Sequence, residues 1–168
     1  MMSALPPTLD APEASAKSRA METTPPAALW LGIAGALPFW IAAVCFFTGM
    51  AMTEGQSLAV TLAYGGLMLA FLGGIRWGVA LTAVDERQRS RALIGGAVPV
   101  MMGLAAFFLA PPIGLSLIII ALFIQALADV LSAERGVLPG WFGRLRALLT
   151  ALAVIPVLLV LTRVILVG

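Results

Sequence analysis

Five long apolar stretches, separated by short polar breaks, dominate the chain from residue 28 onward. They lie near 28–50, 56–82, 92–110, 113–133 and 145–167. A bilayer core of about 30 Å is crossed by roughly 20 helical residues, and each stretch is close to that length. No strand-length alternation of apolar and polar residues occurs, and helices satisfy their own backbone in lipid. The pattern therefore predicts an all-α integral membrane protein, a bundle of five transmembrane helices.

The breaks between these stretches, at 53–55, 85–87, 111–112 and 134–144, carry charged or turn-forming residues. Because they are short, consecutive helices are expected to be antiparallel neighbours. Residues 1–27 differ in composition, with many prolines among Ser, Thr, Ala and mixed charges. This composition predicts a disordered N-terminal tail without the features of a secretory signal or a mitochondrial presequence. The run METTPP at Met21 also suits a translation start.

Basic residues are distributed unevenly between the two sides of the predicted bundle. The tail and the second and fourth loops carry lysine or arginine, whereas the first and third loops carry none. Only Arg163, near the C-terminus, falls on the opposite side. Since lysine and arginine accumulate in cytoplasmic loops, we expect a cytoplasmic N-terminus and a C-terminus outside.

Composition supports a membrane protein and narrows its chemistry. Of the 168 residues, 61% are hydrophobic and 11% are charged, whereas soluble domains carry about 25% charged residues. A net charge of +2 gives no electrostatic support for nucleic-acid binding. The chain has no histidine, and Cys45 is its single cysteine, which argues against histidine-ligated haem, zinc sites, Cys–His nucleophiles and an internal disulfide. We therefore predict no cofactor, no metal site and no catalytic residue.

Polar groups inside the predicted spans need partners there. Each proline in a span frees the carbonyl four residues earlier and can kink its helix, and for Pro156 that carbonyl belongs to Leu152. Tyr64 and Gln125 also lie in spans, so each is expected to find one hydrogen-bond partner within the bundle. The three prolines in spans are Pro38, Pro99 and Pro156.

Small residues at helical spacing predict close helix packing. Gly74 and Gly78 form a G-xxx-G pair, a spacing that lets two helix backbones approach each other. We favour packing within the bundle over dimerisation for this pair, because every helix already has neighbours.

Three segments carry a resemblance to a known family. They are LGIAGALPFW at 31–40, YGGLMLAFLGGIRWG at 64–78 and LPGWFGRLRALLT at 138–150. Together they resemble the signature blocks of domain-of-unknown-function family 3429, the transmembrane protein 69-like family. The similarity runs from about residue 26 to the C-terminus.

This resemblance implies a bacterial inner-membrane or mitochondrial protein with about five spans, and no agreed activity. The family pattern has a basic residue before the Trp-Gly, which Arg76 provides, and an acidic residue late in the fourth span, matched by Asp129. The resemblance supplies no catalytic residue.

Arg76 interrupts otherwise apolar sequence and allows two interpretations. Unpaired charge in the hydrocarbon costs at least roughly 2.5–3.5 kcal/mol at the midplane. Arg76 lies about 30 Å along its span from Gln56, near the inner edge of the core, so its side chain could extend to lipid headgroups. Alternatively, it could pair with Asp129, about 24 Å along a helix that runs in the same direction. We favour the first interpretation and keep the pair as the functional hypothesis.

A second candidate site is an aromatic and basic cluster suited to the cytoplasmic interface. Aromatic rings prefer the headgroup level, and arginines bind lipid phosphates there. The cluster would contact an anionic phospholipid or a partner protein. Its members are Trp77, Trp141, Phe142, Arg144 and Arg146.

These features favour a non-enzymatic protein of the bacterial inner membrane, with a mitochondrial inner membrane as the weaker alternative. We expect an accessory subunit or assembly factor of a larger, possibly respiratory, membrane complex, with the lipid bilayer and another membrane protein as partners. The rival hypothesis is a small transporter or channel that uses Arg76 and Asp129, because broken helices and intramembrane charge mark transporters. A membrane enzyme is third, since acid–base chemistry would have little to use.

Overall fold

The computed structural model describes residues 23–167, and this part of the chain is all-helical. Most of the expected N-terminal tail, residues 1–22, lies outside the described residues. The five helices are α2 (Pro26–Thr48), α3 (Glu54–Thr82), α4 (Glu86–Phe108), α5 (Pro111–Glu134) and α6 (Gly140–Val167). Each is long and apolar enough to cross a membrane, at 23 to 29 residues. The predicted fold class is confirmed.

Local signals set the helix boundaries more sharply than hydropathy does. Helix α3 begins with a capping box, in which the Thr53 side chain and the Gln56 side chain each accept from the other residue's backbone N–H. Helix α4 begins at Glu86, well before residue 92, because the Asp85 side chain accepts from the Gln88 backbone N–H and caps a polar first turn. Apolar sequence marks where a helix enters lipid, whereas caps mark where it begins.

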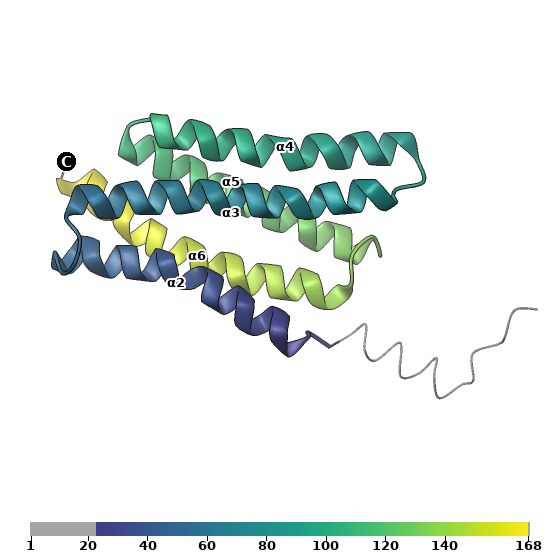
Figure 1. Ribbon diagram of the computed structural model, residues 1–168, viewed down its shortest axis with the longest axis horizontal. Coiled ribbons are helices and arrows are strands. Elements are labelled where there is room, and N and C mark those ends of the chain that lie inside the picture. Colours follow the sequence, from purple (N-terminus) through teal and green to yellow (C-terminus); the bar gives the residue numbers. More distant parts are fainter. Residues whose placement is uncertain (1–22, 168) are drawn as a thin grey trace, which may run out of the picture.

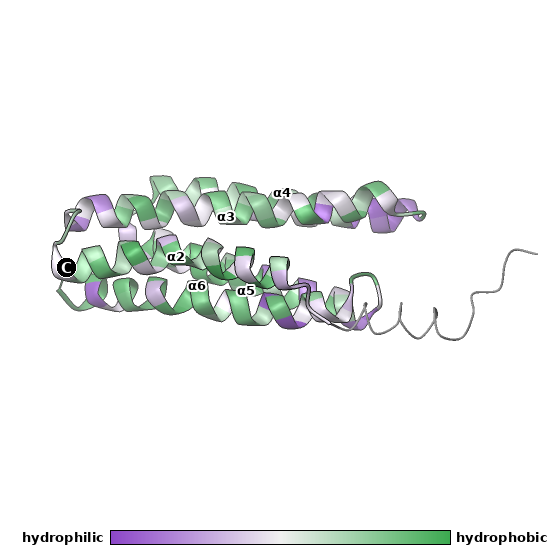
Figure 2. Ribbon diagram, turned by 60° about the horizontal axis from the view of Figure 1, so that its bottom comes forward, coloured by the Kyte–Doolittle hydropathy of each residue, from purple (hydrophilic) through white to green (hydrophobic). Residues whose placement is uncertain are grey.

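Each helix runs antiparallel to the helix before it in the chain. Helix α2 therefore begins at the end of the bundle opposite to the C-terminus (Figure 1). Helix α3 contacts α2, α4 and α5, while α6 contacts α5 and α2. We call the end that contains the α3–α4 and α5–α6 loops the basic end. Hydrophobic residues, coloured green, cover the helices along most of their length, and hydrophilic residues, coloured purple, gather toward the basic end (Figure 2).

Apolar side chains from four helices fill the centre of the bundle. Phe39 of α2, Leu69 of α3, Ile118 of α5 and Val157 of α6 are almost completely buried. Many large apolar side chains instead face outward, among them Phe71 and Leu81 of α3. In water this surface would be costly, whereas lipid tails solvate it.

Three polar side chains tie the helices together through backbone carbonyls. The Trp40 indole donates to the carbonyl of Leu152 at 3.0 Å, the carbonyl that Pro156 frees. The Tyr64 hydroxyl donates to the Gly35 carbonyl, at 2.7 Å. The Gln125 side-chain amide donates to the Leu72 carbonyl, at 3.2 Å. The hydrogen-bond partners expected inside the bundle for Tyr64 and Gln125 are thus confirmed. The proline in α6 is thus accommodated by a bond from α2.

Replacing Trp40 with phenylalanine should lower the free energy of unfolding by about 1–3 kcal/mol, because the Leu152 carbonyl would lose its partner in a water-poor environment. Thermal unfolding in mild detergent can be followed by maleimide labelling of Cys45, the single cysteine, which is buried. Trp77→Phe is the matched control, because Trp77 is 52% exposed. Equal melting temperatures for the two variants would contradict the role of the indole bond.

The glycine prediction was wrong in its choice of residues. A Cβ at Gly74 or Gly78 would meet no atom within 4 Å, so neither glycine lies at a helix contact of the bundle. The close approach lies one helix face away, where a Cβ on Gly103 would be 2.8 Å from the Cα of Gly66 and a Cβ on Gly73 would clash with the Gly96 carbonyl oxygen. Spacing alone does not tell which face of a glycine-rich helix meets its neighbour.

The three prolines remain inside continuous helices. Pro99 and Pro156 are buried, and Pro38 is partly buried. Their rings thus face neighbouring helices to different degrees.

Candidate functional site: a buried charge cluster beside an apolar cavity

Asp129 of α5 is the centre of a buried charge cluster and is 1% exposed. Its Oδ1 accepts from Arg76 Nη2 of α3 at 3.0 Å, and its Oδ2 accepts from Arg146 Nε of α6 at 2.9 Å. One carboxylate therefore joins three helices. We call Arg76, Asp129 and Arg146 the charge cluster.

Helix register explains why Arg76 meets Asp129. Helices α3 and α5 run in the same direction, and Gln125 Nε2 donates to the Leu72 carbonyl at 3.2 Å. One turn further along both helices, four residues from Leu72 and from Gln125, lie Arg76 and Asp129. The Gln125–Leu72 and Arg76–Asp129 contacts thus join the same two helix faces, one helical turn apart.

Arg146 reaches Asp129 from the opposite chain direction. Helix α5 ends at Glu134, five residues after Asp129, and helix α6 begins at Gly140, six residues before Arg146. A tight α5–α6 connection therefore brings them to the same depth, about 9 Å into α6. This near symmetry about the loop is visible in the sequence and could have identified Arg146 as a second partner.

The charge cluster has an excess of positive charge. Two guanidinium groups share one carboxylate, so its formal net charge is +1. The side chain of Arg76 is 18% exposed and lies nearer to the surface, whereas the side chain of Arg146 is 7% exposed. Buried charge is costly unless it is balanced, so the more deeply buried arginine depends most on Asp129.

Several polar atoms at the charge cluster and beside it lack a hydrogen-bond partner among the described residues. They include Nε of Arg76, Nη2 of Arg146 and the hydroxyl oxygen of Thr150, all buried. Thr150 lies one turn after Arg146 on the same face of α6. Buried polar groups in proteins are normally satisfied, so this side of α6 has unused capacity for hydrogen bonds.

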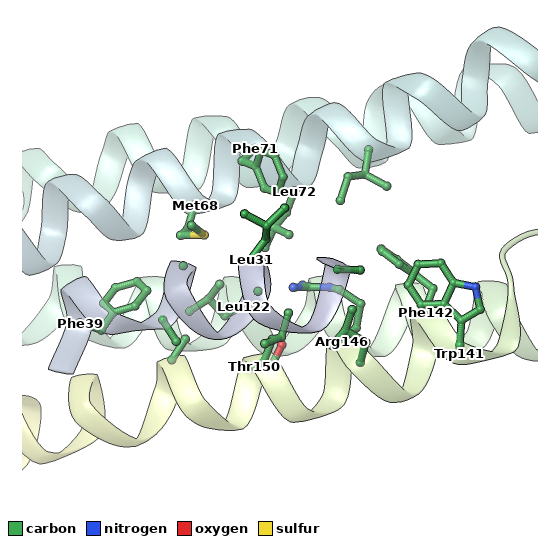
Figure 3. A pocket seen from close by; sticks show the side chains of 18 residues that line it. Leu31, Phe39, Met68, Phe71, Leu72, Leu122, Trp141, Phe142, Arg146 and Thr150 are labelled. Carbon is green, nitrogen blue, oxygen red and sulfur yellow. The ribbon is translucent and has the colours of Figure 1, made fainter. Parts of the chain in front are cut away.

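An apolar cavity of about 370 Å³ adjoins Arg146 and Thr150. Helices α2, α3, α5 and α6 contribute to its wall. Figure 3 shows Arg146 and Thr150 extending from α6 among apolar side chains, with Trp141 and Phe142 close to Arg146. The cavity is lined by Leu31, Phe39, Met68, Phe71, Leu122, Trp141, Phe142, Arg146 and Thr150, together with further leucine, isoleucine, alanine and glycine residues.

The candidate aromatic and basic interface does not form one surface. The prediction that Arg146 belongs to it was wrong, because Arg146 is buried in the bundle. Arg146 points inward to Asp129 because the buried carboxylate needs the charge. Trp141 and Phe142 pack edge to face at 5.8 Å between ring centroids and line the cavity. Trp77 lies over Gly96 of α4, and Arg144 is exposed.

Thr150 was missed by the sequence reasoning. Threonines in helices commonly donate to the carbonyl four residues earlier, so nothing in the sequence distinguishes Thr150 from the others. Only the packing of α6 against α2 and α5 places it on a cavity. Within residues 23–167 no group of three or more Cys, Asp or Glu side chains could hold a metal ion.

The five spanning helices and the buried intramembrane charges define the class: this is a multi-pass α-helical membrane protein. Residues 24–162 match the family model described as "Protein of unknown function (DUF3429)", and the chain belongs to that family. It is 30% identical over 146 residues to transmembrane protein 69 of Xenopus tropicalis. That alignment covers 81% of this chain and 54% of the relative, so the chain spans about half the length of the frog protein. No solved structure matches the chain.

Proposed function

We propose that this protein is a non-enzymatic accessory subunit or assembly factor of a larger membrane complex, and that it binds a transmembrane helix of a partner. The observation that carries this proposal is an outward row of small residues on α3. Ala70, Gly74 and Gly78 follow one another at four-residue spacing, and the two glycines are exposed with open space above them. Such a row lets a foreign helix backbone approach closely.

The surroundings of this row suit a helix of another protein. A shallow groove of about 320 Å³ runs beside it between α3 and α4, and its wall is almost entirely apolar. Trp77, 52% exposed, borders the groove and offers a large flat contact. Exposed tryptophans are common anchors of interfaces, and small residues beside them leave room for the partner's side chains.

The chemistry of the charge cluster supports a structural rather than a catalytic role. Both oxygens of Asp129 accept hydrogen bonds from arginines, so neither oxygen is free to take a proton from a substrate as a general base would. The alternative, a small transporter that uses Arg76 and Asp129, receives less support, because the adjoining cavity is apolar except at Arg146 and Thr150 and offers a polar solute no continuous path.

The proposal includes a location in the bacterial inner membrane with the N-terminus inside. The arginines of the first turns of α4 support this orientation, because Arg87, Arg89 and Arg91 lie together at the basic end. Anionic phospholipid headgroups are the expected contacts of this end.

Leucine at Gly74 is expected to release the partner without unfolding the bundle, because its side chain would fill the open space above α3. Blue-native electrophoresis of membranes solubilised in mild detergent should show wild-type protein in a larger complex and Gly74→Leu as the free protein. Ala151→Leu is the matched control, at an exposed small residue of α6. It should stay in the complex.

Recovery of wild-type protein from its native membrane as a monodisperse monomer would overturn the proposal. Co-purification that persists equally in both leucine variants would place the partner on another face.

A further inference from the structure

We propose that the cavity beside the charge cluster binds an anionic amphiphile, with its acidic head group at Arg146 and Thr150 and its acyl chain between α2, α3 and α6. This inference does not depend on the accessory role. It rests on unpartnered polar atoms, on the excess charge and on the shape of the cavity.

The first observation is that two buried polar side chains on one wall of the cavity lack partners. Arg146 and Thr150 are 5% and 4% exposed, and both line the cavity. Nη2 of Arg146 and the hydroxyl of Thr150 make no hydrogen bond within residues 23–167. Both can donate, and they lie one helical turn apart, so a single oxyanion between them could accept from both.

Thr150 differs in this respect from most hydroxyl side chains of the bundle. Five serine and threonine hydroxyls donate to the carbonyl four residues earlier, whereas those of Thr150 and Ser57 make no hydrogen bond within residues 23–167, and of these two only Thr150 lines the cavity. The back-bonded hydroxyls are those of Thr48, Thr61, Ser116, Ser132 and Thr162. The free hydroxyl on the cavity wall is therefore available to a ligand.

The second observation is electrostatic. The charge cluster carries a formal net charge of +1, and this charge is buried in the helical bundle. One monoanionic group beside Arg146 would neutralise it, and a charge-assisted hydrogen bond is stronger here than in water. A neutral lipid or a cation would not supply this balance.

The third observation is the cavity itself. It follows α6 from Trp141 to Ala153, a distance of about 18 Å, so it is elongated along the helix axis. Phe39, Met68 and Leu122 form its apolar part beyond Thr150. Leu31 and Phe71, on α2 and α3, line the cavity and are exposed, so a ligand can enter laterally from lipid between these helices. Its volume of about 370 Å³ lies in the range of ligand sites, roughly 300–1,000 Å³.

The position of the polar groups sets the orientation of the ligand. Arg146 lies about 9 Å inside the basic end of α6, and Trp141 and Phe142 lie between it and that end. The head group would thus sit near the membrane surface, with the chain directed toward the bundle centre. A fatty acid and an acidic phospholipid share this chemistry, an oxyanion on an acyl chain.

Quenching of Trp141 tests the proposal with the full-length protein in phosphatidylcholine nanodiscs. The probes are dibromostearate, its methyl ester and a dibromoacyl phosphatidylglycerol. Subtracting the fluorescence of Trp141→Phe isolates the Trp141 signal. We expect saturable quenching by dibromostearate or the phosphatidylglycerol, whichever is the source of the head group, and no saturation with the ester.

Thr150→Val should weaken binding of the quenching probe by about tenfold, since a hydrogen bond to a charged group is lost. Thr61→Val is the matched control, because Thr61 is buried in α3 and its hydroxyl is bonded to the Ser57 carbonyl. It should bind as wild type does.

Three results would overturn the proposal: equal quenching by acid and ester, unchanged binding in Thr150→Val, or displacement of the probe by inorganic phosphate alone. The first would mean simple partition into an apolar space. The last would mean a small-anion site without selectivity for an acyl chain.

Discussion

Replacing Asp129 with asparagine is expected to lower the free energy of unfolding by about 3–5 kcal/mol, because two buried arginines would lose their shared counter-charge. Asparagine keeps the size of the side chain, so the loss would come from charge and not from a cavity. The cluster would change from a formal net charge of +1 to +2. Labelling of Cys45 during a thermal ramp in mild detergent measures the effect.

Arg76→Met is the comparison that separates charge from packing. It leaves Asp129 paired with Arg146 at 2.9 Å, which is a balanced pair, and the replaced side chain is the more exposed of the two arginines. We expect a loss well below that of Asp129→Asn. A larger loss for Arg76→Met would show that excess positive charge does not govern the stability of the cluster.

Alanine at Gly73 is expected to destabilise the bundle by about 1–3 kcal/mol, whereas alanine at the adjacent Gly74 should leave it as stable or more stable. A Cβ at Gly73 would clash with the Gly96 carbonyl oxygen and push α3 away from α4. A Cβ at Gly74 would meet nothing within 4 Å, and alanine is the better helix former by about 1 kcal/mol.

The same labelling of Cys45 compares the two alanine variants, which differ by one position and share the same composition change. The expected result is a loss of stability in Gly73→Ala and no loss in Gly74→Ala. Equal destabilisation by both alanines would mean that α3 and α4 do not approach each other at Gly73.

The apolar stretches and the short breaks between them predicted the five helices. Unpaired backbone N–H and C=O groups are costly in lipid, and a helix pairs them within a single stretch. The sequence reasoning also raised the contact of Arg76 with Asp129 as a hypothesis, since both charges reach similar depth on parallel helices, but favoured the lipid-facing interpretation. The structure places the two side chains 3.0 Å apart.

The parts that could not be predicted depend on helix rotation. Glycines on two faces of α3 look alike in the sequence, and only packing shows that Gly73 meets α4 while Gly74 faces outward. Arg146 appeared interfacial because it follows an aromatic pair, yet its face of α6 turns toward Asp129. The cavity is likewise a product of how α2 lies against α3 and α6, and no local pattern encodes it.

The central claim is that Asp129 stabilises the bundle by balancing the buried arginines, and a double-mutant cycle of Asp129→Asn with Arg146→Met tests it most directly. The double variant removes the most deeply buried unbalanced charge and leaves Arg76, whose side chain is 18% exposed. We expect it to be more stable than Asp129→Asn alone, with a coupling of about 1–3 kcal/mol. Additive losses, in which Arg146→Met destabilises the Asp129→Asn protein as much as the wild type, would contradict the account.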